Sequence, residues 1–147
     1  MSLASGDVLA SFAFEFEVEG ISIAQFAQVS GASGSVGVIE HRENTKGGKP
    51  IVKKMPGATS YGDITLRRGR TTSNALWEWF TLVEQGKINE ARKNASIVLF
   101  DYAYGEVARY NLLNCWISQI RLGELSAGAN TPLIEEAVIV HEGMTLE

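Results

Sequence analysis

The sequence predicts a mainly β domain with a single convincing helix, which is α+β by count. Apolar and polar residues alternate with a period of two over several stretches, as on half-buried strands. Breaks containing glycine separate these stretches, and an apolar stripe with helical spacing lies within residues 73–86. A chain of 147 residues is most simply one domain, residues 1–147, and folding buries roughly two-thirds of the surface that the unfolded chain exposes.

The first part of the chain is expected to hold three strands. Residues 12–19 alternate phenylalanine or valine with alanine or glutamate, which predicts a strand with one apolar and one acidic face. A turn at Gly20 and a strand over residues 21–29 would complete a hairpin. A break at residues 31–34 precedes a third strand over residues 35–43.

Residues 44–57 are expected to form a long exposed loop. The segment combines two prolines and three glycines with four lysines. Loops of about fourteen residues are rare in compact domains and are usually functional or disordered. The apolar residues Ile51, Val52 and Met55 favour a functional loop, because they need a partner surface.

A strand and the helix follow. Residues 60–68 alternate, and Ile64 and Leu66 share the apolar face. The helix is expected over about residues 73–86, where Gly86 can end it. Its N-cap candidates are Thr71, Thr72 and Ser73. The apolar stripe, which is expected to join the core, consists of Leu76, Trp79, Phe80 and Val83.

The rest of the chain returns to β structure after a polar stretch, residues 87–94, that is compatible with a short helical turn. Strands are expected over residues 95–103 and 106–116, around a turn at Tyr104 and Gly105. Residues 117–124 are expected either to extend the second of these strands or to form a further strand. The last strand, residues 133–142, is apolar on both faces, which predicts a central position in a sheet. The three prolines all fall in expected loops, so the sheet edges are unblocked and another copy of the chain is expected to cover them.

Positive charge is concentrated in residues 41–70. This segment holds eight basic and two acidic residues, a net +6, whereas the rest of the chain has five basic and fifteen acidic residues, a net −10. Such polarity in a small domain indicates docking. A surface with both signs can bind another copy head to tail, and such contacts generate rings or open filaments.

The sequence gives no indication of catalysis, so the chain is predicted not to be an enzyme. His41 and His141 are far apart in the chain, and the single Cys115, in an apolar context, excludes a thiolate zinc site. Glu135 and Glu136 are neighbours on a strand and therefore point to opposite faces. The glycines form no nucleotide-binding motif. No cofactor, metal or catalytic residue is expected.

The composition also argues against nucleic acid and membrane as partners. The net charge is −4, and the basic residues are not interleaved with aromatic ones, so specific nucleic-acid recognition is not expected. No apolar stretch approaches the roughly 18 residues that span a bilayer. The first ten residues lack the pattern of a signal peptide, so synthesis in the cytoplasm is expected without a membrane anchor.

Seven segments of the chain form a recognisable series. They are FEFEVEGI (14–21), VSG (29–31), VIEHRE (38–43), MPG (55–57), YGDITLRRG (61–69), LWEW (76–79) and NTPLIEEAVIVHEG (130–143). In this order they resemble the tube proteins of contractile phage tails and contractile injection systems, which are distantly related to the Hcp tube of type VI secretion. The resemblance extends over nearly the whole chain, and the order and spacing of the segments make it specific. One departure is His41, where the family more often has an aromatic residue.

The resemblance implies a small β-barrel or sandwich flanked by one helix. Six subunits would form a ring lined by one continuous β-barrel, and the rings would stack into a hollow tube inside a contractile sheath. The implied partners are further copies of the chain, the sheath, baseplate and tube-terminating proteins, and a DNA or protein effector cargo. The particle would be a phage tail or an injection device.

Site residues follow from this resemblance together with the charge pattern. Residues expected to contact other subunits or rings are Lys46, Lys49, Ile51, Val52, Lys53, Lys54, Met55, Arg67 and Arg68. Residues expected to face the lumen or solvent are Glu15, Glu17 and Glu19. The alternative function is a monomeric β-barrel module that binds a small apolar ligand.

Overall fold

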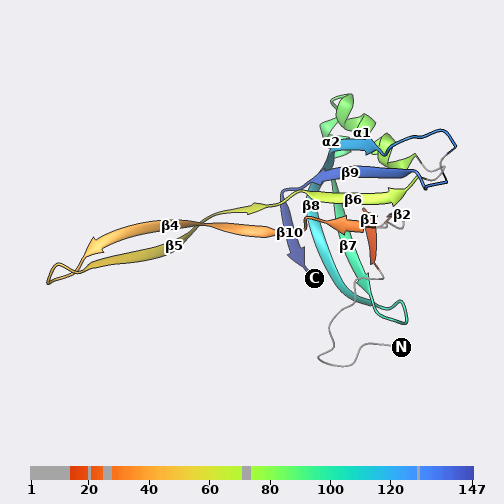
Figure 1. Cartoon of the computed structure of the whole chain (residues 1–147). Coiled ribbons are helices and arrows are strands. Elements are labelled where there is room, and N and C mark those ends of the chain that lie inside the picture. Colours follow the sequence, from red (N-terminus) through yellow and green to blue (C-terminus); the bar gives the residue numbers. More distant parts are fainter. Residues whose placement is uncertain (1–13, 20, 25–27, 71–73, 129) are drawn as a thin grey trace.

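The computed structural model describes residues 14–19, 21–24, 28–70, 74–128 and 130–147, which form ten strands and two helices (Figure 1). Some expectations fall outside these residues: the start of the first strand, the turn at Gly20, part of the second strand and the N-cap candidates Thr71, Thr72 and Ser73. In chain order the elements are β1 (Phe14–Val18), β2 (Ile21–Ala24), β3 (Gln28–Ser30), β4 (Gly34–Asn44), β5 (Pro50–Tyr61), β6 (Ile64–Gly69), α1 (Ala75–Glu84), α2 (Ile88–Ala91), β7 (Lys93–Phe100), β8 (Glu106–Leu122), β9 (Ile134–Val140) and β10 (Gly143–Leu146).

Eight described strands form one antiparallel sheet in the order β2-β1-β7-β8-β9-β6-β3, with β10 paired to β8 beside that path. The strand β8 serves both halves of this sheet. Its first part pairs with β7 and its last part, from Trp116 to Leu122, pairs with β9. Asn114, near the end of the first part, has a φ of 51°. Figure 1 shows the result, in which β7 and β8 run crosswise to β6 and β9.

The core lies between the two halves of the folded sheet. It contains inward-facing residues of the strands together with Leu76 and Trp79 of α1, while Phe80 packs against it and Val83 is half-buried. Trp79 Nε1 donates a hydrogen bond of 2.6 Å to the carbonyl oxygen of Ala91, which ties α1 to α2. The buried strand residues include Phe16, Val18, Ile64, Leu66, Ile97, Leu112, Cys115, Ile117, Ala137 and Ile139.

The mainly β fold with a flanking helix is therefore confirmed. The hairpin of β7 and β8 turns at residues 101–105, and β9 lies between β8 and β6, as a central strand should. The short helix α2 occupies the polar stretch that follows α1. The strand β10 was not expected, because the four residues Gly143–Leu146 are too short to display a period.

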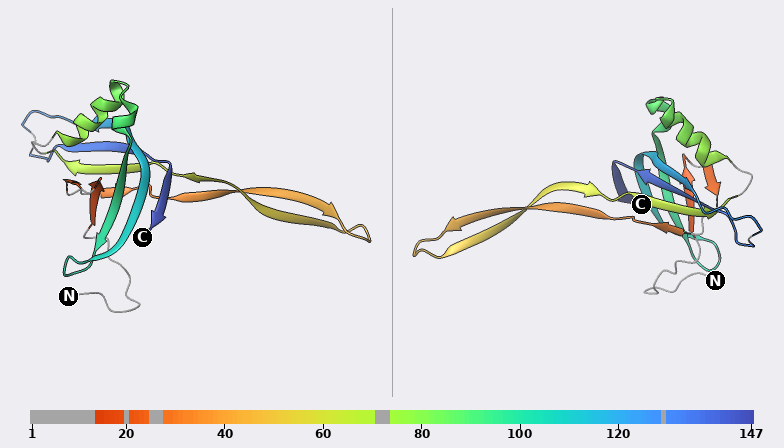
Figure 2. Two further views of the ribbon diagram at one scale, coloured as in Figure 1. Left: turned by 180° about the vertical axis from the view of Figure 1, so that it is seen from behind. Right: turned by 45° about the horizontal axis from the view of Figure 1, so that its top comes forward.

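The expectation of a loop over residues 44–57 is wrong for most of its length. Residues 50–57 belong to β5, and only residues 45–49 turn between β4 and β5. Two of the prolines, Pro50 and Pro56, thus lie in a strand. Pro50 begins it, and Pro56 lies beside a shift in the strand register. Both positions tolerate proline, and a two-stranded ribbon has only edge strands. Figures 1 and 2 show this ribbon extending away from the rest of the molecule.

Candidate functional site

The ribbon of β4 and β5, residues 34–61, is called the arm below. Its exposed apolar side chains are the most unusual feature of the described surface. Six of them are between 41% and 65% exposed, which is high for a soluble protein unless a partner covers them. They are Val36, Val38, Ile39, Ile51, Val52 and Met55.

Both faces of the arm carry such residues. Residues directly opposite in an antiparallel pair point to the same face, and neighbours along a strand point to opposite faces. On one face Ile39 is opposite Met55, and Ile51 belongs to this face too, because it is four positions from Met55 along β5. Val38 and Val52 belong to the other face, with Val36. An isolated two-stranded ribbon is at best marginally stable in water, so two apolar faces indicate contacts on both sides.

The arm is also basic. It holds five basic and two acidic residues, a net +3, whereas the rest of the chain holds eight basic and fifteen acidic residues, a net −7. Glu43 lies 3.5 Å from Lys53 Nζ and 3.1 Å from His41 Nε2, in exposed pairs. Seven of the nine residues expected to make subunit contacts lie on or at the turn of this arm: Lys46, Lys49, Ile51, Val52, Lys53, Lys54 and Met55.

The arm continues the edge of the main sheet through a tight joint. Ser30 pairs with Thr65 in the sheet, and four residues further on Gly34 pairs with Tyr61 in the arm. Between them Gly31 has a φ of +88°, and a Cβ there would lie 2.3 Å from the carbonyl oxygen of Asp63. A Cβ at Gly62 would lie 2.3 Å from Ser33 Oγ. The joint thus requires glycine at position 31, where both the positive φ and the backbone contact exclude a side chain, whereas at position 62 the close contact is with a side chain.

His141 links this joint to the body of the domain. Its Nε2 lies 3.0 Å from the carbonyl oxygen of Gly62, and its Nδ1 lies 3.2 Å from the carbonyl oxygen of Gly143. The ring also contacts Tyr61, with centroids 5.7 Å apart. The ring is buried, so these contacts fix the base of the arm to the junction of β9 and β10.

The two remaining predicted contact residues have opposite locations. Arg67 is exposed on β6, where its Nε lies 3.5 Å from Glu136 Oε2. Arg68 points into the core, only 1% exposed, and its Nε lies 3.1 Å from Glu135 Oε2. The expectation that Arg68 lies on a contact surface is therefore wrong, because alternation along β6 turns it inward.

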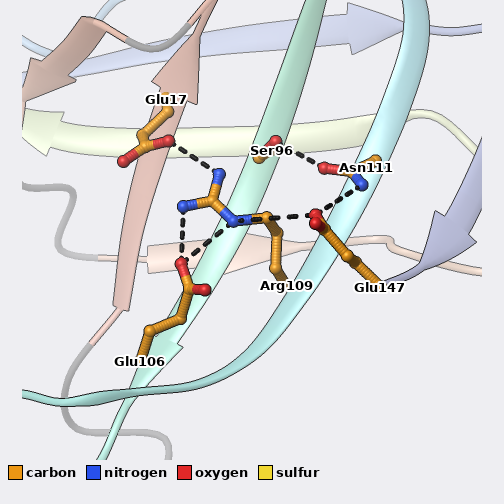
Figure 3. A network of polar contacts seen from close by, with 6 residues as sticks. All are labelled: Glu17, Ser96, Glu106, Arg109, Asn111 and Glu147. Carbon is orange, nitrogen blue, oxygen red and sulfur yellow. Dashed lines mark hydrogen bonds and ion pairs between the residues drawn. The ribbon is translucent and has the colours of Figure 1, made fainter.

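A second polar cluster surrounds Arg109 on the other half of the sheet (Figure 3). Its guanidinium contacts Glu17 Oε2 at 2.8 Å and Glu106 Oε1, and its Nε lies 4.0 Å from Glu147 Oε2. Hydrogen bonds to Glu106 and Glu17 raise the pKa of Arg109. No pattern in the sequence singles out Arg109, because its partners come from three separate strands or their ends.

The glutamates expected to face lumen or solvent belong to this half of the sheet. Glu17 is half-buried by its pairing with Arg109, and Glu15 is also half-buried. Glu19 is exposed and lies 3.9 Å from Lys93 Nζ. These side chains point away from the core residues Phe16 and Val18, as alternation predicts.

The described part of the chain contains no cluster of three metal-ligating side chains. Cys115 is fully buried, and burial raises the pKa of its thiol to about 12. An apolar hollow of about 510 Å³ is lined by residues that include Phe14, Ile97, Leu99 and Tyr110. Neither helix among the described residues has the length and hydrophobicity to cross a bilayer.

Comparison with known proteins gives one family and several similar folds. The family model of the T4-like virus tail tube protein gp19 matches residues 10–145. No curated protein sequence is significantly similar to the chain.

Among solved structures, a chain of the PVC sheath-tube complex, an extracellular contractile injection system in its extended state, is 22% identical with a TM-score of 0.80. The match covers 97% of this chain and 93% of that one. A chain of the tube-terminating cap of the anti-feeding prophage is 20% identical, with a TM-score of 0.83, covering 100% and 95%. Hcp1 from Flavobacterium johnsoniae is 18% identical, with a TM-score of 0.58, covering 92% and 94%.

Proposed function

This chain belongs to the family of the T4-like virus tail tube protein gp19, and from that premise we propose that it forms the inner tube of a contractile tail or injection system. Six copies close a ring, and stacked rings form a hollow shaft. Contraction of a surrounding sheath drives this shaft and its cargo through a target envelope. The role of the subunit is mechanical, and it performs no catalysis.

The observation that carries this proposal is the arm with apolar side chains on both faces. A single binding partner would cover one face and leave the other in water. A stacked tube offers two partners, because a projecting arm meets the adjacent subunit of its own ring on one side and a subunit of the next ring on the other. The apolar burial on both faces then stabilises the lateral and the axial contact together.

Charge and strand edges support the same arrangement. The net +3 of the arm complements the net −7 of the rest of another copy. Within the described residues neither β4 nor β5 has a second neighbouring strand. Pairing of these edges with another copy removes the free edges that otherwise promote aggregation, and ring closure extends the pairing into one continuous barrel.

The proposed partners follow from the same assembly. The similar chains come from a sheath-tube complex, a tube-terminating cap and a baseplate. We infer that this tube likewise contacts a sheath, ends on a terminating protein and starts on a baseplate. DNA or a protein effector occupies the lumen. The subunit is made in the bacterial cytoplasm and functions in a tail or an extracellular particle.

Light scattering and negative-stain imaging of the purified chain, across protein concentration, test the proposal. Rings or tubes are expected as concentration rises. A variant in which a two-residue turn replaces residues 37–58 serves as the control. It should keep the circular dichroism spectrum of a folded β protein and remain monomeric.

A chain that stays a monomer of 16.0 kDa at every concentration, with and without a preformed baseplate, would refute the proposal. The alternative, a monomeric module with an apolar ligand in the hollow beside Phe14, predicts that result together with uptake of an apolar fluorophore.

A further inference from the structure

The outer face of the half-sheet β8-β9-β6-β3 carries a row of polar side chains that spans all four strands. Arg67 Nη1 donates to Gln28 Oε1 at 3.5 Å, and Arg67 Nε lies 3.5 Å from Glu136 Oε2. Arg121 Nη2 donates to Glu136 Oε1 at 2.8 Å. The register places these residues directly opposite one another from strand to strand. We call this row the ladder.

The two faces of this half-sheet differ completely. On the inner face, Leu66 and Ala137 are fully buried in the core, beneath α1 and the strands β1 and β7. On the outer face, Arg121 is 63% exposed and Arg67 is 46% exposed. Among the described residues, therefore, a second layer of structure covers the inner face of the half-sheet but leaves the ladder open to solvent.

The arm identifies this half-sheet as the part that faces neighbouring subunits. The edge pair β3 and β6 continues through the glycine joint into β4 and β5, so an arm that reaches another copy extends from this edge. Figures 1 and 2 show the arm leaving the body on the side of β6 and β9. A barrel that runs from subunit to subunit would thus be built from these strands.

Simple geometry then fixes which face turns toward the axis of a ring. The circumference available to each subunit grows with distance from the axis. The bulky second layer, formed by β1, β7, β10 and the helices, fits only on the outside of such a barrel. The uncovered face must turn inward.

Given the proposed tube function, on which this step rests, we propose that the ladder face is the wall of the channel and the surface that the moving cargo contacts. Glu136 is shared by two guanidinium groups, so the ladder presents paired charges with one positive charge in excess. Charges satisfied by each other in the wall hold a passing cargo weakly. The glutamates near Arg109 then face the outside of the barrel, so Glu15, Glu17 and Glu19 are solvent-side residues and not lumen residues.

Cysteine labelling in assembled tubes tests this assignment. The native Cys115 provides no background, because it is fully buried and its thiol has a raised pKa. Gln119, opposite Val138 on the ladder face, and Arg121 are both exposed, and each is replaced separately, as Gln119→Cys and Arg121→Cys. The matched controls are Glu84→Cys at the end of α1 and Thr145→Cys on β10, both exposed.

Each variant is treated with a small maleimide and with a maleimide coupled to a carrier protein too large to enter a tube. In tubes verified by imaging, the ladder cysteines should react with the small reagent only, whereas Glu84→Cys should react with both. After the tubes are dissolved, all variants should react with both reagents.

Three results overturn the assignment while leaving the tube function intact. The first is reaction of the ladder cysteines with the large reagent in intact tubes. The second is size-dependent protection of Thr145→Cys, which would put the channel on the opposite half of the sheet. The third is protection of the ladder cysteines from both reagents, since it would place them in a subunit contact. Failure of every variant and of the parent chain to form tubes, with and without a preformed baseplate, overturns the tube function itself.

Discussion

Arg68 and Glu135 form an ion pair inside the core, with 3.1 Å between Nε and Oε2 and at most 1% of either side chain exposed. Their sequence neighbours Arg67 and Glu136 form a second pair on the outside of the same two strands. The register of β6 and β9 places each arginine opposite its glutamate. The dipeptides Arg67-Arg68 on β6 and Glu135-Glu136 on β9 thus supply one buried and one exposed ion pair.

Removal of one partner of the buried pair should strongly destabilise the subunit. Arg68→Met leaves the Glu135 carboxylate in the core without its cation, and such changes typically cost about 3–5 kcal/mol. The double variant Arg68→Met/Glu135→Leu should recover most of this loss, because no charge is then buried. Urea denaturation of the unassembled subunit, followed by tryptophan fluorescence, measures both effects.

The exposed pair provides the control for this prediction. Arg67→Met should change the free energy of unfolding by less than about 1 kcal/mol, since solvent screens the pair. Equal losses in Arg68→Met and in the double variant would show that the ion pair is not what stabilises this part of the core.

Charge reversal on the arm should impair assembly without affecting the fold. Lys53→Glu/Lys54→Glu changes the arm from net +3 to net −1, which removes its attraction to the acidic remainder of another copy. Fewer tubes are expected in imaging and light scattering at low salt. Lys87→Glu/Arg92→Glu, at exposed positions beside α2, is the matched control and should assemble normally. Normal tube yield from the arm variant at all salt concentrations contradicts the prediction.

Apolar residues on both faces of the arm should each be necessary for tubes. Val52→Ser and Met55→Ser remove side chains that are already exposed in the subunit, so the free energy of unfolding of the monomer should scarcely change. In a tube these side chains would be buried, and each lost methylene would weaken the contact by about 0.8 kcal/mol. Light scattering should show a higher critical concentration for both variants and an unchanged one for Leu125→Ser, an exposed apolar residue outside the arm. If only one of the two arm variants has a higher critical concentration than the parent chain, the result would argue against contacts on both faces.

Much of the fold could be predicted from the sequence because period-two alternation is strong where one face is buried. The strand with Phe14, Phe16 and Val18 and the helix stripe of Leu76 and Trp79 have core contacts that fix their pattern. The arm lacks such contacts. Its first strand was expected over residues 35–43, but both faces of the arm are exposed, so no buried face fixes a pattern in β5, and Pro50 and Pro56 favoured a loop there.

The candidate site could be predicted only in part for the same reason. Local charge density identified the lysines of the arm, since it depends on composition alone. Charge density could not separate Arg67 from Arg68, which differ because Arg68 faces inward. Pairing of the two arginines with Glu136 and Glu135 across an antiparallel strand pair is a sequence signal that could have indicated one inward and one outward ion pair. The cluster at Arg109 depends on tertiary contacts between β1, β8 and the residue after β10, which no local pattern contains.

The two joint glycines should differ in how substitution is tolerated. Gly31→Ala forces a Cβ against the carbonyl oxygen of Asp63 at a φ of +88°, and this contact is with backbone, which cannot turn away as a side chain can. A loss of about 1–3 kcal/mol in unfolding free energy is expected. Gly62→Ala meets the side-chain oxygen of Ser33 first, so Ser33→Ala/Gly62→Ala should recover part of its loss in the same denaturation experiment. No recovery in the double variant would mean that the clash with Ser33 does not determine the cost.

Burial of the Cys115 thiol should make the subunit less stable at high pH. Its pKa is raised from 9.0 to about 12, mainly because the thiolate would lose hydration in the core. Between these values the native state keeps a proton that the unfolded state has released, so this contribution is complete below pH 9 and declines as the pH rises toward 12. Denaturation curves across this range should show a steeper decline for the parent chain than for Cys115→Ala, which shares every other titrating group. If the unfolding free energies of the parent chain and of Cys115→Ala decline in parallel, the thiol does not contribute. The protonation of Cys115 is checked independently by its alkylation rate, which should not change from pH 8 to about 9.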